Sequence, residues 1–239
     1  MNTKLIGQFS AAIIIVLVLW MLSSFISSNN FNFSNVETVE DYVQYRESGM
    51  TSRTVSYFFT FLFTISIISL FVLLYRFCRI KYPEWAAIGI FFLPAYAALS
   101  ILFYSAQVTV VPQLIMMYHQ PEYQQAMTML FSQFLPGTEN IATRLASVPY
   151  FFLGITSVIL GLILSKEQNK MLKIAGILTA VSGIGFLSGL PALFIRNTFI
   201  TILGASTVIG FLGTLVLFCI IFLRQSSRDN VESSMNTIP

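Results

Sequence analysis

Four polar side chains recur along one otherwise apolar stretch, and their types suit the binding of a small molecule. They follow the spacing i, i+4, i+8 and i+11 and are Tyr96, Ser100, Tyr104 and Gln107. This spacing places them on one face of a helix. A polar face exposed to lipid is costly, because nothing there satisfies its hydrogen-bonding groups. We therefore expect this face to point into the interior of the protein.

Two arginines are predicted to lie near the mouth of the same site. Arg144 and Arg196 each fall at the outer end of an apolar segment, and guanidinium groups bind carboxylates and phosphates through paired hydrogen bonds. Together with the polar stripe they form a candidate pocket that is open outward and suited to a small anionic molecule or a lipid headgroup. In the alternative interpretation, both arginines extend to lipid phosphates while the tyrosines form an interfacial belt.

The sequence gives little support for a catalytic function. The middle of the apolar segments holds no Asp, Glu, His, Lys or Arg, so proton-coupled transport, metal-dependent hydrolysis and serine catalysis each lack a base or a ligand. The two cysteines, Cys78 and Cys219, form no motif with a histidine, and the only histidine, His119, is typical of a solvated side chain. We expect no catalytic residue, no metal and no cofactor.

The elements that position these residues are predicted to be membrane-spanning helices. Of the 239 residues, 56% are hydrophobic and only 10% are charged, whereas soluble domains average about 25% charged residues. So few charges cannot cover the surface of a soluble fold of this size. The net charge of +3 is too small and too scattered for a nucleic-acid-binding surface, so the expected surroundings are a lipid bilayer.

Six segments are long and apolar enough to cross a bilayer, which takes about 20 residues. They cover approximately residues 5–27, 54–78, 85–111, 141–165, 172–195 and 199–223. The expected fold is an all-α, six-helix transmembrane bundle that forms one domain over residues 1–225, with a disordered tail at 226–239. The first segment follows Lys4 as in a signal peptide, but it lacks a clear small-x-small cleavage site and is expected to be retained.

Lysine and arginine concentrate on one side of these spans. That side holds nine of them: Lys4, Arg76, Arg79, Lys81, Lys166, Lys170, Lys173, Arg224 and Arg228. The other side holds four: Arg46, Arg53, Arg144 and Arg196. Because the more basic connections of membrane proteins lie in the cytoplasm, both termini are predicted to be cytoplasmic, and the long connections 28–53 and 112–140 are predicted to lie outside.

The two outer connections are each predicted to hold a short amphipathic helix. In the first, Val36, Val39 and Val43, with Tyr42, fall near helical spacing among acidic residues, and Gly49 is suited to end the helix. The second helix is expected over residues 121–134. Its apolar stripe, a candidate lid or partner surface, consists of Tyr123, Met127, Leu130 and Phe134. Since it carries no Lys or Arg, it is not expected to bind a membrane unaided.

Small residues four apart in the last three spans predict close helix packing. The pairs are Ser157 and Gly161, Gly185 and Gly189, and Ser206 and Gly210. The same faces could join copies of the chain in a homo-oligomer. Pro94 and Pro191 lie inside predicted spans and are expected to kink them.

The layout resembles a group of six-span bacterial membrane proteins defined only as a domain of unknown function. The likeness rests on the long outer connection after the first span, the amphipathic stretch before the fourth, and the glycine-rich pair "YFFLGITSVILGLIL" and "LKIAGILTAVSGIGFLSGL". The resemblance implies a bacterial inner membrane location and supplies no activity or functional residue.

The expected function is non-enzymatic binding of a protein or lipid partner at the outer face. The alternative is a small-molecule binding or transport subunit with an outward-facing pocket. An intramembrane enzyme ranks last, because the spans supply no acid/base pair.

Overall fold

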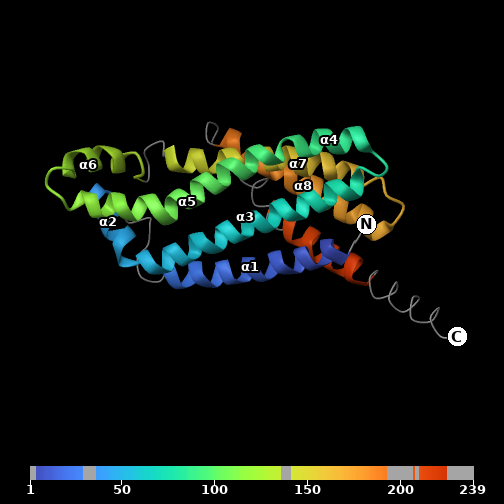
Figure 1. Ribbon diagram of the computed structural model, residues 1–239, viewed down its shortest axis with the longest axis horizontal. Helices are drawn as coiled ribbons and strands as arrows, with labels where there is room; N and C mark the ends of the chain where they lie inside the picture. Colours follow the sequence, from blue (N-terminus) through green and yellow to red (C-terminus); the bar gives the residue numbers. More distant parts are fainter. Residues whose placement is uncertain (1–3, 29–35, 136–140, 193–206, 208–209, 225–239) are drawn as a thin grey trace. The chain divides into compact units, whose positions relative to one another are not determined.

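The computed structural model describes residues 4–28, 36–135, 141–192, 207 and 210–224, and these residues are helical wherever they have regular secondary structure. The helices are α1 (Lys4–Ser28), α2 (Val39–Ser48), α3 (Met50–Cys78), α4 (Pro83–Phe91), α5 (Leu93–Tyr118), α6 (Gln124–Ser132), α7 (Ile141–Leu164) and α8 (Lys170–Ala192). A further apolar helix covers Gly210–Arg224. The predicted all-α class is confirmed (Figure 1).

Five stretches of the described chain are long and apolar enough to cross a membrane, whereas six were predicted. They are Lys4–Ser23, Met50–Cys78, Pro83–Tyr118, Ser147–Leu164 and Lys170–Gly189. The predicted sixth span at 199–223 is described mainly over the shorter helix Gly210–Arg224. The membrane-spanning character of the chain therefore stands, and the sixth crossing remains a prediction.

The third predicted span is longer than expected and is interrupted near its start. It forms two helices, α4 and α5, which meet at Phe92, two residues before Pro94. The backbone N–H of Tyr96 still donates to the carbonyl of Phe92 over 3.3 Å, so helical bonding resumes at once. At its other end α5 continues to Tyr118, seven residues beyond the predicted limit, so much of the outer connection 112–140 is helical. Pro191 lies in the last turn of α8, beyond which the chain is outside the described residues.

The chain divides into two compact units. Unit 1 comprises residues 1–15, 65–97 and 149–239, and unit 2 comprises residues 16–64 and 98–148. Helices α1, α3 and α5 each contribute to both units, while α4, α8 and nearly all of the predicted span in α7 belong to unit 1.

In unit 1, α7 and α8 pack with their backbones in contact at two glycine pairs. A Cβ on Gly161 would lie 2.7 Å from the carbonyl oxygen of Gly176, and a Cβ on Gly154 would lie 2.8 Å from that of Gly183. Each pair excludes any larger side chain, and close backbone approach at small residues is what holds helices together in lipid. Glycines seven apart make these contacts, whereas the sequence analysis paired residues four apart. Gly189, by contrast, faces open space.

Three further contacts bring the basic connections of unit 1 to one end. A Cβ on Gly7, near the start of α1, would lie 2.9 Å from Leu223 Cγ, near the end of the last helix. The rings of Phe77 and Phe222 are 5.8 Å apart, so α3 also ends there. Beyond α3, Lys81 forms an ion pair of 2.6 Å with Glu167 in the connection between α7 and α8.

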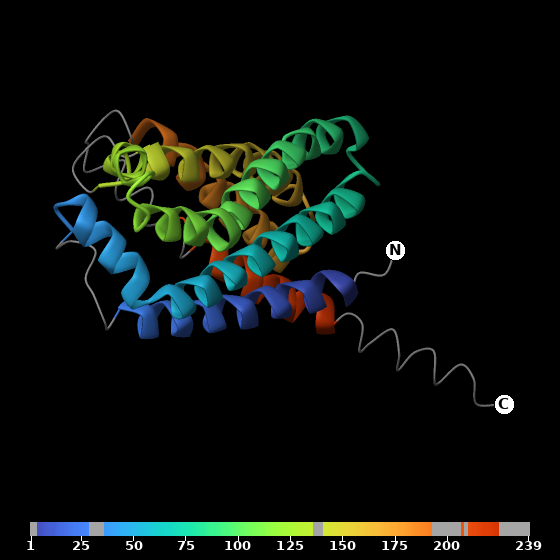
Figure 2. The same ribbon diagram turned by 60° about the vertical axis from the view of Figure 1, so that its left-hand side comes forward.

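In unit 2, the first outer helix forms as predicted. Thr38 and Asp41 build a capping box, in which the Asp41 N–H donates to Thr38 Oγ1 over 3.1 Å and the Thr38 N–H donates to Asp41 Oδ2 over 2.9 Å. Such reciprocal bonds satisfy two backbone donors that a helix start leaves unpaired. The predicted apolar residues Val36, Val39, Tyr42 and Val43 are all buried. Gly49 ends the helix, and α2 runs at a steep angle to the first turns of α3 (Figure 2).

The second outer helix is shorter than predicted but packs against the first (Figure 1). Helix α6 covers nine residues, after a turn in which the Tyr123 N–H donates to the carbonyl of Gln120. Its buried residue Phe131 lies with its ring 5.5 Å from Tyr42 of α2 and 6.1 Å from Tyr118 of α5. We call α2, the end of α5 and α6 together the outer layer, after the side of the membrane on which they are predicted to lie. Its apolar core consists of Val36, Val39, Tyr42, Val43, Val111, Ile115, Tyr118 and Phe131.

Candidate functional site

The predicted polar stripe on α5 is largely buried. The exposed fraction is 0% for Tyr96, 1% for Ser100 and 8% for Tyr104, and Gln107 is half-buried. The expectation that this face points inward is therefore confirmed. Tyr96 belongs to unit 1, where its ring lies 6.0 Å from that of Tyr150. The other three residues belong to unit 2.

The structure does not describe the side chains of the two arginines that are predicted to border this stripe. The structure gives the backbone of Arg144 in the first turn of α7, without a description of its side chain, and Arg196 lies outside the described residues. Their place at the mouth of a pocket remains a prediction.

A different arginine reaches the stripe in unit 2. Arg46 of α2 is 8% exposed; one of its terminal nitrogens donates to Gln107 Oε1 over 3.3 Å and the other to the Tyr57 hydroxyl over 3.2 Å. Helix α2 brings it there because Val39, Tyr42, Val43 and Arg46 follow the spacing i, i+3, i+4 and i+7 and form its buried face. The guanidinium thus joins α2 to α3 and α5 through neutral acceptors.

A second buried arginine lies one turn into α3. Arg53 is 6% exposed, and its Cζ lies 3.5 Å from the centre of the Tyr45 ring. None of its three guanidinium nitrogens has a hydrogen-bond partner among the described residues. Gly49 makes room for it, since a Cβ there would lie 3.2 Å from Arg53 Cζ. A cation over an aromatic face is attracted by the ring, but the ring carries no negative charge.

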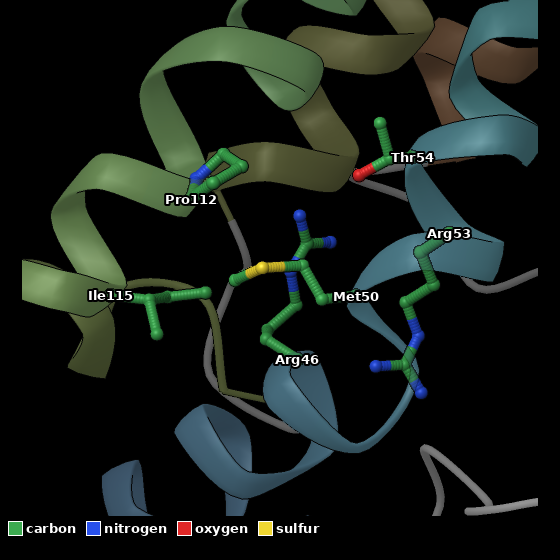
Figure 3. Close-up of a pocket in the computed structure, with 6 residues that line it drawn as sticks. All are labelled: Arg46, Met50, Arg53, Thr54, Pro112 and Ile115. Atoms are coloured by element: carbon green, nitrogen blue, oxygen red, sulfur yellow. The ribbon is translucent and has the colours of Figure 1, made fainter.

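A small pocket lies beside both arginines. It has an empty volume of about 200 Å³, including its open mouth, and is lined by Arg46, Met50, Arg53, Thr54, Pro112 and Ile115. In Figure 3 the Arg46 guanidinium extends between Pro112 and Thr54, while that of Arg53 turns toward the junction of α2 and α3. Because the volume of about 200 Å³ counts open solvent at the mouth, the enclosed space is much smaller and suits at most a small group.

The predicted stripe of α6 divides between two environments. Met127 and Phe134 pack against the apolar core of the outer layer, whereas Tyr123 and Leu130 are exposed, at 39% and 37%. The helix therefore buries Phe131, whereas Leu130 and the 70% exposed Met129 on the helix, and Tyr123 just before it, are exposed. As a lid or partner surface, the stripe remains a prediction.

His119 has a partner that was not expected. Its Nε2 lies 2.5 Å from Glu47 Oε1 of α2, and both side chains are largely exposed. The adjacent Tyr118 hydroxyl donates to Glu40 Oε1 over 2.9 Å. These two contacts attach the acidic side of α2 to the end of α5. No group of three or more His, Cys, Asp or Glu side chains that could hold a metal is present within the described part of the chain.

Two groups of α2 have shifted pKa values. Hydrogen bonds from the side chain and then the backbone N–H of Thr38, followed by the N–H of Glu37, lower the pKa of Asp41 below its ordinary value of 3.8. Burial raises the pKa of Tyr42, against a smaller opposing effect of the Arg46 charge. Asp41 is therefore a carboxylate, and Tyr42 a neutral phenol, at any physiological pH.

Comparisons with protein-family models, with curated proteins and with solved structures found no match to the chain. The function is therefore argued from the residues of this chain alone.

Proposed function

We propose that the chain is a non-enzymatic integral membrane protein of the bacterial cell membrane, with six spans, cytoplasmic termini and an outer layer that binds a partner. Two observations support the topology. The start of α1 lies beside the end of the last helix, as an even number of crossings requires. The contacts Phe77–Phe222 and Lys81–Glu167 bring the basic connections to that same end, which the positive-inside rule assigns to the cytoplasm.

The observation that carries the proposed binding function is the exposed surface of the outer layer. Its helices already share a buried core, so its remaining apolar side chains are not needed to hold it together. Met129 and Leu130 of α6 and Tyr123 just before it are exposed. On α2 and just before it, Glu37, Glu40 and Glu47 are exposed, whereas Arg46 and Arg53 are buried.

This surface is suited to a protein partner that carries basic and apolar groups. Aromatic and Met side chains are enriched at the centre of protein interfaces. The acidic residues around them would favour and steer a positively charged partner. Anionic lipid headgroups would be repelled, so a protein is preferred over a lipid as the partner at this surface. Of the small residues considered for a homo-oligomer, Gly161 and Gly210 already contact α8 within the chain, so we place the expected partner contact at the outer layer.

Site-specific photocrosslinking in intact cells tests this proposal. A photoreactive residue at Leu130 should give one discrete protein adduct, while one at Ile177, an exposed apolar position on α8, should give lipid adducts only. Reversing the charge at Glu37 with Glu37→Lys should reduce the Leu130 adduct several-fold, because a basic partner loses an attractive contact. Lipid adducts alone at both positions would reject the proposed partner binding.

Small-molecule binding is the second candidate function. The observation in its favour is the pocket beside Arg46 and Arg53, which combines buried cationic groups with apolar walls.

A further inference from the structure

Arg46 and Arg53 are buried cations with no carboxylate paired to either among the described residues. The ion pairs in that part of the chain are Lys81 with Glu167 and His119 with Glu47. The other acidic groups of α2 are engaged elsewhere: Glu40 accepts from Tyr118, and Asp41 caps the helix. Two like charges thus line one pocket without a counter-charge.

Their neutral partners offset only part of the cost of burial. A guanidinium is charged at any physiological pH, and removing it from water is unfavourable unless an opposite charge or a full set of acceptors replaces the lost hydration. Arg46 donates to one hydroxyl and one amide oxygen; Arg53 lies against the Tyr45 ring, and its nitrogens have no partner within the geometric limits of a hydrogen bond among the described residues. Both side chains retain N–H groups that can still donate.

We propose that this pocket is an anion site that binds a phosphate group, carried either by a lipid headgroup or by a free phosphate. Guanidinium groups match the oxygens of phosphate through paired hydrogen bonds. In Figure 3 the Thr54 hydroxyl faces the Arg46 guanidinium across the space and offers a further donor. Met50, Pro112 and Ile115 form the apolar part of the wall, which lowers the local dielectric constant and strengthens the attraction.

The size and position of the pocket limit which ligands it can bind. Since the volume of about 200 Å³ includes open solvent at the mouth, only one small anionic group could enter, and the rest of a larger molecule would stay outside. The site lies between α2, α3 and α5 and does not include Tyr123, Met129 or Leu130. The anion site goes beyond the proposed partner binding, because either proposal can fail while the other holds. It also supplies a ligand class for small-molecule binding, the second candidate function.

The first experiment measures thermal unfolding of the full-length protein in neutral detergent during titration with inorganic phosphate, against chloride at equal ionic strength. The melting temperature should rise saturably by about 2–4 °C. Arg46→Gln should weaken the apparent phosphate affinity at least about tenfold, because it removes charge-assisted hydrogen bonds. Arg79→Gln is the matched control: it removes the same charge from an exposed side chain outside the pocket and should respond as the native protein does.

The second experiment distinguishes the lipid from the free ion. The protein is placed in nanodiscs of phosphatidylcholine alone, whose phosphate is balanced by choline, or mixed with anionic phosphatidylglycerol. Stabilisation by phosphatidylglycerol but not by inorganic phosphate assigns the site to a lipid headgroup, and the reverse assigns it to free phosphate. Stabilisation by neither, or equal losses in Arg46→Gln and Arg79→Gln, overturns the anion site.

A further variant keeps the test valid if Arg46→Gln unfolds. Arg53→Met keeps an unbranched, though shorter, side chain and removes the charge that has no hydrogen-bond partner in the described structure. Without phosphate, this variant should melt at or above the native temperature, since an unpaired buried charge is lost. With phosphate, it should gain less than half of the native shift. A variant that melts lower than the native protein without phosphate, and still shows the full phosphate shift, contradicts the proposal.

Discussion

Asp41 fixes the start of α2 through its ionised form. Its carboxylate accepts from the backbone N–H groups of Thr38 and Glu37, and these bonds, with the Thr38 side chain, lower its pKa. A group whose pKa is lowered by folding contributes stability that is fully present above its unfolded value of 3.8. That stability is lost as the pH falls through the lower, folded value.

We therefore predict that acidification weakens the outer layer through Asp41. The melting temperature in detergent should fall in the native protein as the pH decreases below about 4, and Asp41→Asn should show a smaller fall because it has no carboxylate to protonate. Glu84→Gln is the control, since Glu84 lies outside unit 2 on α4. An identical pH profile for Asp41→Asn and the native protein would rule out this role of the cap.

The burial of α2 could be predicted residue by residue, but the partners of its arginine could not. The spacing of Val39, Tyr42 and Val43 correctly predicted one buried face, and the same spacing continues to Arg46. The sequence alone identifies Arg46 only as one of the four basic residues on the predicted outer side. Its acceptors Tyr57 and Gln107 lie 11 and 61 residues away, so only the tertiary structure reveals that a charge at this position can be buried.

At the scale of the elements, Phe131 attaches α6 to the rest of unit 2. It is 2% exposed and lies against rings from both α2 and α5. The exposed residue Leu130 stands beside it on the same helix, which makes the two a matched pair for mutation.

We predict that Phe131→Ala destabilises the outer layer by about 3–5 kcal/mol, as a large cavity in a packed core does, whereas Leu130→Ala changes stability by less than about 1 kcal/mol. Limited proteolysis between α5 and α6 measures the release of the helix: cleavage should accelerate strongly for Phe131→Ala alone. Equal protection of the two variants would show that α6 does not depend on Phe131.

The contact between α7 and α8 leaves no space for one additional methyl group. A Cβ on Gly161 would lie 2.5 Å from the backbone nitrogen of Ala180, and backbone atoms cannot rotate out of the way as a side chain does. The two helices would have to separate along their length.

We predict that Gly161→Ala lowers the free energy of unfolding by about 1–3 kcal/mol, the usual range for overpacking. The same substitution at Gly189, where nothing lies within 4 Å, should be neutral or slightly stabilising, because Ala favours the helix. Reversible unfolding in mixed micelles compares the two variants. A Gly161→Ala variant as stable as Gly189→Ala would contradict the close packing.

The sequence predicted tight packing in this region, and two of the residues it named, Gly161 and Gly210, make close contacts with α8. A spacing of four marks residues one turn apart on a single helix, and it correctly included Gly161. The observed contacts instead recur every seven residues, at Gly154 with Gly161 and at Gly176 with Gly183. That pattern appears only when the two helices are set antiparallel, which the composition of each helix alone does not reveal.

At the scale of the whole molecule, the proposed topology predicts on which side of the membrane each connection lies. In the proposed topology the connection between α7 and α8, which lies with the basic end of unit 1, is cytoplasmic, and α6, which follows the C-terminal end of α5 in the chain, lies outside. In a protein with Cys78 and Cys219 changed to serine, Gln125→Cys on α6 should react with a membrane-impermeant thiol reagent in intact cells. Gln168→Cys should react only after the membrane is permeabilised.

Labelling of Gln168→Cys in intact cells would reverse the proposed orientation, and equal labelling of both cysteines before permeabilisation would reject the six-span topology. Five of the spans were predictable because length and hydropathy alone define them. The arrangement of the spans in two compact units could not be predicted from the sequence, because helices in lipid associate through shape and small residues rather than through a hydrophobic pattern.

The paired glycines of α7 and α8 also set where this protein tolerates changes of length. One residue inserted between Gly176 and Gly183 rotates everything after it by about 100° around the helix, so one glycine pair would be lost whatever residue is inserted. Residues 165–169, in the connection between the helices, can lengthen without that rotation, because a longer turn absorbs the addition. Natural variants and inserted tags should therefore accumulate in the connection, while the seven-residue intervals stay constant in length.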